Sequence, residues 1–158
     1  MRTLVVIDAQ SSYLNKISVS NYENIVSNIQ LMVNHWKKYG WPVLFVEYGE
    51  DRTLPELKAP LYKYDKKFII KKCEPNGAGE ILKAIQHHNL PKELHVCGVN
   101  WNQCVQTTIY HLLAYDKDVN ISAYRQASNP QYFRDKFGKY HYWSDMKHTY
   151  KGRFKVKY

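Results

Sequence analysis

The feature that most constrains the fold of this chain is the stretch 94–113, where an apolar run changes into a helical pattern with a cysteine at the junction. Leu94 to Val99 is short and mostly apolar, which predicts a buried parallel strand. Apolar residues then recur at helical spacing, at Val105, Ile109, Leu112 and Leu113. This spacing places Cys104 in the first turn of a helix with Asn102 as its N-cap, where backbone N–H groups and the helix dipole favour a thiolate.

The rest of the chain repeats this alternation of strand and helix. Further strands are predicted at residues 4–7, 43–46, 68–70 and 119–123, and helices at about 20–40 and 79–89. The first helix has capping-box spacing at Ser20 and Glu23, and a loop rich in charge and proline runs from Gly49 to Asp65. The pattern predicts a three-layer α/β fold, in which a doubly wound, mainly parallel sheet of five or six strands is flanked by helices.

Length and cysteine content set the outer bounds. A chain of 158 residues is expected to form one domain with a single core. Its three cysteines include no C-x-x-C pair, which argues against a disulfide framework and a structural zinc site. We find no signal peptide and no apolar run of membrane-spanning length, so the expected location is the cytoplasm.

The C-terminal segment, about residues 125–158, is basic and aromatic. From Tyr124 to Tyr158 there are nine Lys or Arg, two Asp and ten aromatic residues. Basic residues between stacking rings suit single-stranded nucleic acid, but the same composition fits rings packed on the sheet with their charged neighbours in water. We favour packing, because the last strand needs a cover. Residues 130–137 are compatible with a short helix, and alternation from Phe154 predicts an edge strand.

Reactive side chains follow three of the predicted strands. Asp8 ends the first, Lys71 and Lys72 end the third, and Cys104 follows the fourth. The carboxyl ends of parallel strands face the same way, so these residues should open onto one crevice. A thiolate to attack a carbonyl carbon, a carboxylate to move the proton and an ammonium to keep that carboxylate ionised would together make a hydrolase. The alternatives stay open that Asp8 only caps a helix, Lys72 is a solvated strand end and Cys104 is a small buried residue.

Three motifs carry a resemblance to a known family. They are Leu-Val-Val-Ile-Asp8-Ala-Gln10, a lysine that ends a strand, and Cys97-Gly98-Val-Asn-Trp-Asn-Gln-Cys104-Val. Taken in order, with this spacing and strand context, they resemble the signatures of the isochorismatase-like cysteine hydrolases, which include nicotinamidases and N-carbamoylsarcosine amidases. The resemblance covers roughly residues 1–125.

The resemblance implies a role for each matched residue. Asp8 matches the family's aspartate and Cys104 its nucleophile, while Lys72 matches its lysine better than Lys71, which should point to the opposite face of the strand. It also implies a cis peptide bond between Val99 and Asn100, and an oxyanion hole formed by the N–H groups of Asn100 and Cys104. A homo-oligomer, dimer or tetramer, is implied as well.

The chain departs from the family pattern near the nucleophile. Asn100-Trp101 stands where the family commonly has Ala-Thr, and Tyr13 follows the Asp8-x-Gln10 motif. We expect Gln10, Tyr13 and Trp101 to contact the substrate. Trp101 and Tyr13 should also make the pocket smaller and more aromatic than is usual in the family.

A second departure concerns the metal. Nicotinamidases carry an Asp-x-His pair after the second strand, and this chain has Glu47-Tyr-Gly49 there. The sequence therefore predicts no metal site and no cofactor. The predicted function is a metal-independent cysteine hydrolase that cleaves the C–N bond of a small amide or ureido compound through a thioester. Two alternatives remain: a nicotinamidase without its metal, and an inactive relative that binds a partner through the crevice or the basic tail.

Overall fold

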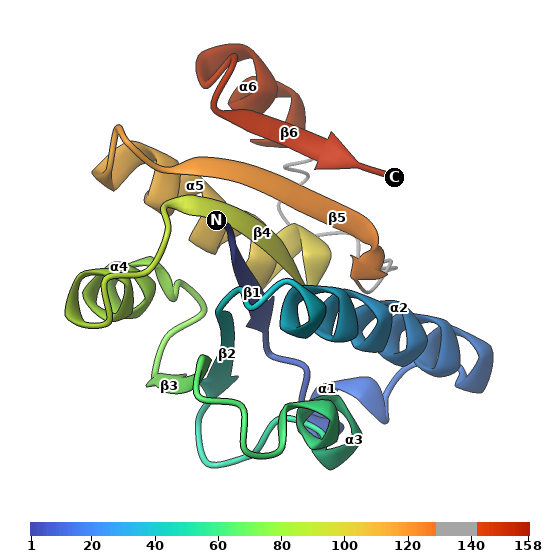
Figure 1. Cartoon of the computed structure of the whole chain (residues 1–158). Helices are drawn as coiled ribbons and strands as arrows, with labels where there is room; N and C mark the ends of the chain where they lie inside the picture. The colour runs from blue at the N-terminus through green and yellow to red at the C-terminus, as the bar shows by residue number, and fades with distance from the viewer. Residues whose placement is uncertain (129–141) are drawn as a thin grey trace.

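The computed structural model describes residues 1–128 and 142–158, and it contains one six-stranded sheet in which every strand pair is parallel (Figure 1). The strand order is β3-β2-β1-β4-β5-β6. The bounds are β1 Thr3–Ile7, β2 Val43–Tyr48, β3 Lys67–Lys72, β4 Glu93–Gly98, β5 Asn120–Ser128 and β6 Phe154–Lys157. The predicted fold class is confirmed, whereas the short helix considered at 130–137 lies outside the described residues.

Helices cover both faces of the sheet and produce three layers (Figure 1). One face carries α2 (Val19–Lys38), with α1 (Ser11–Leu14), α3 (Pro55–Lys58) and the 3-10 turn η1 (Ala59–Leu61) beside it. The other face carries α4 (Ala78–His87), α5 (Gln106–Tyr115) and α6 (Tyr142–Thr149). Alternation along β1 divides the core, because Leu4 and Val6 pack on the first face, while Val5 and Ile7 pack on the second.

The long helix α2 begins earlier than its sequence pattern predicts. Its N-cap is Ser18, whose hydroxyl accepts a hydrogen bond from the Asn21 N–H at 3.4 Å, and Ser20 lies inside the helix. Ser18 and Ser20 are two residues apart, and either hydroxyl can cap a helix. The helix ends at Lys38, and the predicted stop, Gly40, follows two residues later with a φ of +66° that suits the left-handed residue after a helix.

The segment predicted as a plain loop between Gly49 and Asp65 contains α3 and η1. Leu54, Leu57 and Leu61 are buried there against the face that α2 covers. Their three- and four-residue spacing is helical. The surrounding charges and prolines hid this short pattern, so the prediction of an irregular loop was wrong for these residues.

The described part of the C-terminal segment packs on the sheet, as expected. Met146 of α6 and Phe154 of β6 are buried in the core, and the Arg153 guanidinium donates to the backbone carbonyls of Leu113, Asp116 and Val119. These bonds tie the segment to the end of α5. None of the helices in the described ranges is both long and apolar enough to span a membrane.

Candidate active site

Asp8 lies at the carboxyl end of the central strand β1 in a left-handed conformation, with φ of +53°. Its N–H donates to the Val46 carbonyl at 2.9 Å, and its own carbonyl accepts from the Gln10 N–H at 2.8 Å. Aspartate is among the few residues that tolerate this conformation. The sharp turn directs a fully buried carboxylate into the carboxyl edge of the sheet.

Lys72 ends β3 and brings its ammonium to this carboxylate. Its Nζ lies 3.0 Å from Oδ2 of Asp8 and donates to the Pro75 carbonyl at 2.9 Å. The lysine stem passes over Gly77, where an added Cβ would lie 2.9 Å from Cδ of Lys72. The other candidate, Lys71, is exposed on the opposite face, 3.5 Å from Glu50. Of the two neighbouring lysines, only Lys72 contacts Asp8.

Cys104 lies in a wide helical turn, η2 (Trp101–Val105), that precedes α5. The turn starts from Asn100, which is left-handed with φ of +61°, and whose carbonyl accepts from the N–H groups of Gln103 and Val105 at 3.0 and 3.2 Å. Gly98 is required before it, since its φ is +139° and an added Cβ would lie 2.0 Å from the Ile7 carbonyl oxygen.

Two local predictions for this turn were wrong. All described peptide bonds are trans, including the one between Val99 and Asn100 that was expected to be cis. The left-handed conformation of Asn100 turns the chain sharply at this position instead. Asn102 is not an N-cap, since the turn starts from Asn100 and the Asn102 side-chain oxygen accepts a hydrogen bond from the Trp143 indole N–H at 2.9 Å.

The electrostatics of the site favour a protonated thiol beside a carboxylate that can accept a proton. Burial, then the charge of Asp8, raises the pKa of Cys104 to about 11, although Lys72 and the Asn100 side chain oppose the shift. Burial also raises the pKa of Asp8, against the lowering effects of Lys72 and of hydrogen bonding to the thiol. A resting thiolate stabilised by the helix dipole, as the sequence suggested, is therefore not what this environment favours.

The two oxygens of the Asp8 carboxylate differ in their contacts. Oδ2 contacts Lys72, while Oδ1 is buried and has no conventional hydrogen-bond partner among the described residues. The thiol of Cys104 interacts with this carboxyl group. The arrangement is a buried ion pair with a proton-bearing sulfur next to it.

The three residues predicted to contact substrate lie in different environments. Tyr13 of α1 lies near the site, since burial and then the charges of Asp8 and Cys104 raise the pKa of its phenol to about 12. Gln10 directs its amide to backbone groups of residues 48 and 51, and both of its N–H donors are used there. Trp101 is buried in the core and stacks on Trp143 with ring centroids 4.1 Å apart.

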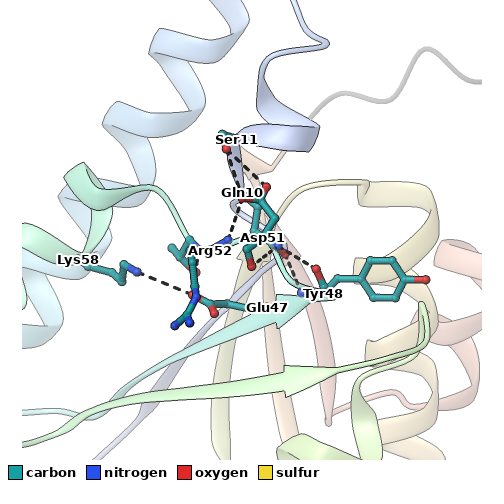
Figure 2. A network of polar contacts seen from close by, with 8 residues as sticks. Gln10, Ser11, Glu47, Tyr48, Asp51, Arg52 and Lys58 are labelled. Carbon is teal, nitrogen blue, oxygen red and sulfur yellow. Dashed lines mark hydrogen bonds and ion pairs between the residues drawn. The ribbon is translucent and has the colours of Figure 1, made fainter.

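Glu47 and Gly49 stand in this chain where nicotinamidases would carry an Asp-x-His pair, and the Glu47 carboxylate contacts other groups of the protein. Its Oε1 accepts from the Thr53 N–H at 2.8 Å, and the Lys58 ammonium lies 3.8 Å away (Figure 2). Within the described ranges, no group of three or more His, Cys, Asp or Glu side chains is placed to hold a metal. A lysine next to a single carboxylate is a poor donor set for a second cation.

The family follows from the sequence as a whole. The model of the isochorismatase domain matches residues 2–127. The chain belongs to the isochorismatase family. The family is one of isochorismatase-like hydrolases, and the matched range contains Asp8, Lys72 and Cys104. No curated protein sequence matches this isochorismatase-family chain.

Solved structures with the same fold carry several activities. The N-carbamoylsarcosine amidase of Thermoplasma acidophilum has a TM-score of 0.74 and 14% identity, over 99% of this chain and 95% of that one. The nicotinamidase SaPncA of Staphylococcus aureus has 0.74 and 15%, over 98% of each chain. The MAR1 ribonuclease of Caenorhabditis elegans has 0.74 and 18%, over 99% and 76%. At these identities the similarities establish the fold alone.

Two residues support Lys72, and the sequence analysis missed the contact of one of them, Tyr48. Tyr48 places its ring 4.9 Å from the Lys72 ammonium, and Gly77 leaves room for the lysine stem. The signal for Tyr48 was present, because it ends β2 and pairs in register with Lys72 at the end of β3. Gly77 follows Lys72 by five residues, and its close contact with the lysine stem depends on how the chain returns after β3.

Proposed function

We propose that this protein is a metal-independent cysteine hydrolase that cleaves the C–N bond of a small amide or ureido compound through a thioester intermediate. The observation that carries the proposal is the fully buried Asp8–Lys72 ion pair beside the thiol of Cys104. Isolating two charges in the core is costly, and a functional site explains why they are retained next to a reactive group.

Acylation begins with the thiol protonated. Asp8 takes the proton from Cys104 as Sγ attacks the carbonyl carbon, so a C–S bond forms while the carbonyl electrons move onto oxygen. The oxyanion is stabilised by the N–H groups of Asn100 and Cys104. When the intermediate collapses, the C–N bond breaks and Asp8 returns the proton to the departing nitrogen, which leaves as ammonia or an amine.

Deacylation uses the same carboxylate. Asp8 takes a proton from water, the water oxygen attacks the thioester carbon, and the C–S bond breaks. The sulfur then takes the proton back from Asp8, so the enzyme returns to its starting state and the acid is released. Lys72 favours the ionised form of Asp8 before each proton transfer, because its Nζ lies 3.0 Å from the carboxylate and no other cation contacts that carboxylate among the described residues.

The surroundings of Tyr13 and Glu47 narrow the class of substrate that we propose. The Tyr13 phenol keeps its proton, since its pKa is about 12, and it therefore offers a hydrogen-bond donor close to the reacting groups. A carboxylate with a lysine beside it is a poor ligand for a metal that would polarise a ring nitrogen or carbonyl, and the Lys58 ammonium lies 3.8 Å from Glu47. We therefore favour a compact polar amide over nicotinamide.

An ammonia-release screen over simple amides, ureido compounds and nicotinamide tests the proposal. Wild-type protein should release ammonia from at least one small amide, and Cys104→Ala should abolish it. The control is Cys73→Ala, which removes an exposed thiol and should retain activity. Release from nicotinamide alone would favour the nicotinamidase alternative. Absence of any Cys104-dependent turnover would favour the binding-protein alternative.

A further inference from the structure

The Lys72 ammonium is enclosed by three different groups. It contacts the Asp8 carboxylate at 3.0 Å and the Pro75 carbonyl at 2.9 Å, and the ring centroid of Tyr48 lies 4.9 Å away. The lysine side chain is fully buried, so its ammonium is removed from bulk water. A cation removed from water gains most from the negative face of an aromatic ring, which makes the Tyr48 contact a strong one of its kind.

Tyr48 is itself held in place by an unusual clamp. The side-chain amide of Gln10 binds both backbone groups of Tyr48. The amide N–H donates to the Tyr48 carbonyl at 2.9 Å, and the amide oxygen accepts from the Tyr48 N–H at 2.7 Å. The second N–H of the same amide donates to the Asp51 carbonyl at 2.9 Å, as Figure 2 shows for the group of contacts around Gln10. The Gln10 side chain therefore fixes the backbone of Tyr48, which is the last residue of β2 in the strand pairing.

We propose that Tyr48 is a positioning residue, which holds the Lys72 ammonium against Asp8 through its ring face, and that Gln10 acts by fixing Tyr48. The inference rests on the proposed function, in which Lys72 keeps Asp8 ionised. It also replaces the expected substrate contact of Gln10 with a structural connection from β1 through β2 to β3. A ring, unlike a second carboxylate, stabilises the cation without competing with Asp8 for it.

The consequence for the site concerns the thiol. The charged and titratable groups that face Cys104 are Asp8 from β1, Lys72 from β3 and Tyr13 from α1, with the Asn100 side chain in its own turn. Lys72 lowers the pKa of Cys104, so a loosely held Lys72 must let that pKa rise. Less thiolate then forms at a given pH, and the proton acceptor Asp8 is held less firmly in its ionised form.

The test replaces the ring while controlling for shape. Tyr48→Leu removes the ring, Tyr48→Phe keeps it without the hydroxyl, and 3,5-difluorophenylalanine at position 48 keeps the shape but weakens the negative ring face. The matched control is Tyr62→Leu, because Tyr62 has a similar contact with Lys63 at 5.6 Å on the exposed surface. Each variant is assayed for kcat and KM. The pH profile of Cys104 alkylation by iodoacetamide is read by peptide mass spectrometry, with exposed Cys73 as an internal reference.

We expect Tyr48→Leu to lower kcat about tenfold, the scale of a desolvated cation–π contact, with a smaller change in KM. The apparent pKa of Cys104 should rise in Tyr48→Leu, stay at its wild-type value in Tyr48→Phe and in Tyr62→Leu, and be intermediate in the difluoro variant. The fluorinated protein keeps the ring volume, so it decides the matter even if Tyr48→Leu does not fold.

Two outcomes would overturn the inference: an unchanged Cys104 profile in the difluoro variant, or Tyr48→Phe shifting that profile as far as Tyr48→Leu does. The alkylation series does not require turnover. If the wild-type protein hydrolyses no amide, the proposed function fails, while the pH profiles still decide whether Tyr48 positions Lys72.

Discussion

Lys71 and Lys72 are adjacent in the sequence, and the alternation of a strand decides which of them reaches Asp8. Side chains of successive strand residues point to opposite faces, so Lys72 shares a face with Phe68 and Ile70, which pack on the core, whereas Lys71 points to solvent. One residue of register thus separates a buried ion pair from a surface charge.

This pair of lysines allows a controlled substitution. Lys72→Met leaves the Asp8 carboxyl group buried without its partner, so we expect the free energy of unfolding to fall by about 3–5 kcal/mol and hydrolysis to be lost. Lys71→Met removes an exposed contact and should change stability by no more than about 0.5 kcal/mol. Chemical denaturation and ammonia release measure both effects. Equal losses in the two variants would contradict the assignment of Lys72.

The raised pKa of Asp8 predicts the acidic side of the pH profile. The mechanism needs the carboxylate, and burial raises its pKa above the ordinary range for aspartate despite the opposing effect of Lys72. As the pH falls through that raised pKa, the proton acceptor is lost, so kcat/KM should begin to fall at a higher pH than for an exposed aspartate. A profile that stays flat down to the usual aspartate range would show that Asp8 is not the proton acceptor.

At this scale the sequence predicted the residues that end strands and missed those that support them. Asp8 and Lys72 follow apolar runs, and Cys104 follows the turn after one, so the rule that strand ends converge was enough to bring them together. Tyr48 was missed although it ends β2 beside Lys72, whereas the left-handed conformations of Asp8 and Asn100 belong to backbone turns that no periodicity encodes. The trans bond at Asn100 shows the limit of carrying local geometry over from a family.

At the scale of elements, the C-terminal segment supports the nucleophile turn directly. The Trp143 ring of α6 stacks on two other rings. Its centroid lies 4.1 Å from that of Trp101 in the turn and 6.0 Å from that of Phe154 in β6. Its indole N–H donates to the Asn102 side chain. The turn that carries Cys104 is thus packed against a helix that follows it by some forty residues in the chain.

Trp143→Ala should therefore affect both stability and activity. Removing the ring leaves a cavity between the turn and β6, and the expected cost is about 3–5 kcal/mol, with a lower melting temperature. We expect kcat to fall as well, because the turn loses its support. Tyr158→Ala is the control, since that ring is 80% exposed at the end of the chain. A variant with normal stability and activity would contradict this role of α6.

The elements themselves were predictable to different degrees. Strands β1 to β4 and the alternation of β6 follow from apolar patterns that extend over several residues. The short helix α3 and the turn η1 depend on three leucines among charges and prolines, and the wide turn η2 depends on one carbonyl, that of Asn100, which accepts two hydrogen bonds. Such short elements are set by tertiary contacts more than by propensity.

At the scale of the whole molecule, the formal net charge is +9, and most Lys and Arg side chains in the described ranges are exposed. Lys151, Lys155 and Lys157 are exposed, whereas Arg153 is used to bind three carbonyls and Phe154 is buried. In the described part of the tail, the rings expected to stack on bases in a nucleic-acid site are largely packed against the protein. A homo-oligomer stays a prediction.

We expect the intact protein to show no measurable binding to single-stranded DNA or RNA at physiological salt. Replacing Lys151, Lys155 and Lys157 by Gln should leave the melting temperature and amide hydrolysis unchanged, because these side chains lie in solvent. Fluorescence anisotropy at several salt concentrations measures the binding. Micromolar affinity that falls steeply with salt, and is lost in the triple variant, would show that the tail binds nucleic acid after all.

The central claim is that Cys104 forms a covalent acyl intermediate with the substrate. Rapid acid quenching during turnover of an amide found in the screen, followed by peptide mass spectrometry, tests it most directly. We expect that the peptide containing Cys104 gains the mass of the acyl group, that the adduct disappears as substrate is exhausted, and that Cys104→Ala forms none. Two results would contradict an acyl intermediate on Cys104. One is turnover that continues in Cys104→Ala, and the other is wild-type turnover with no acyl adduct on Cys104 at any quench time.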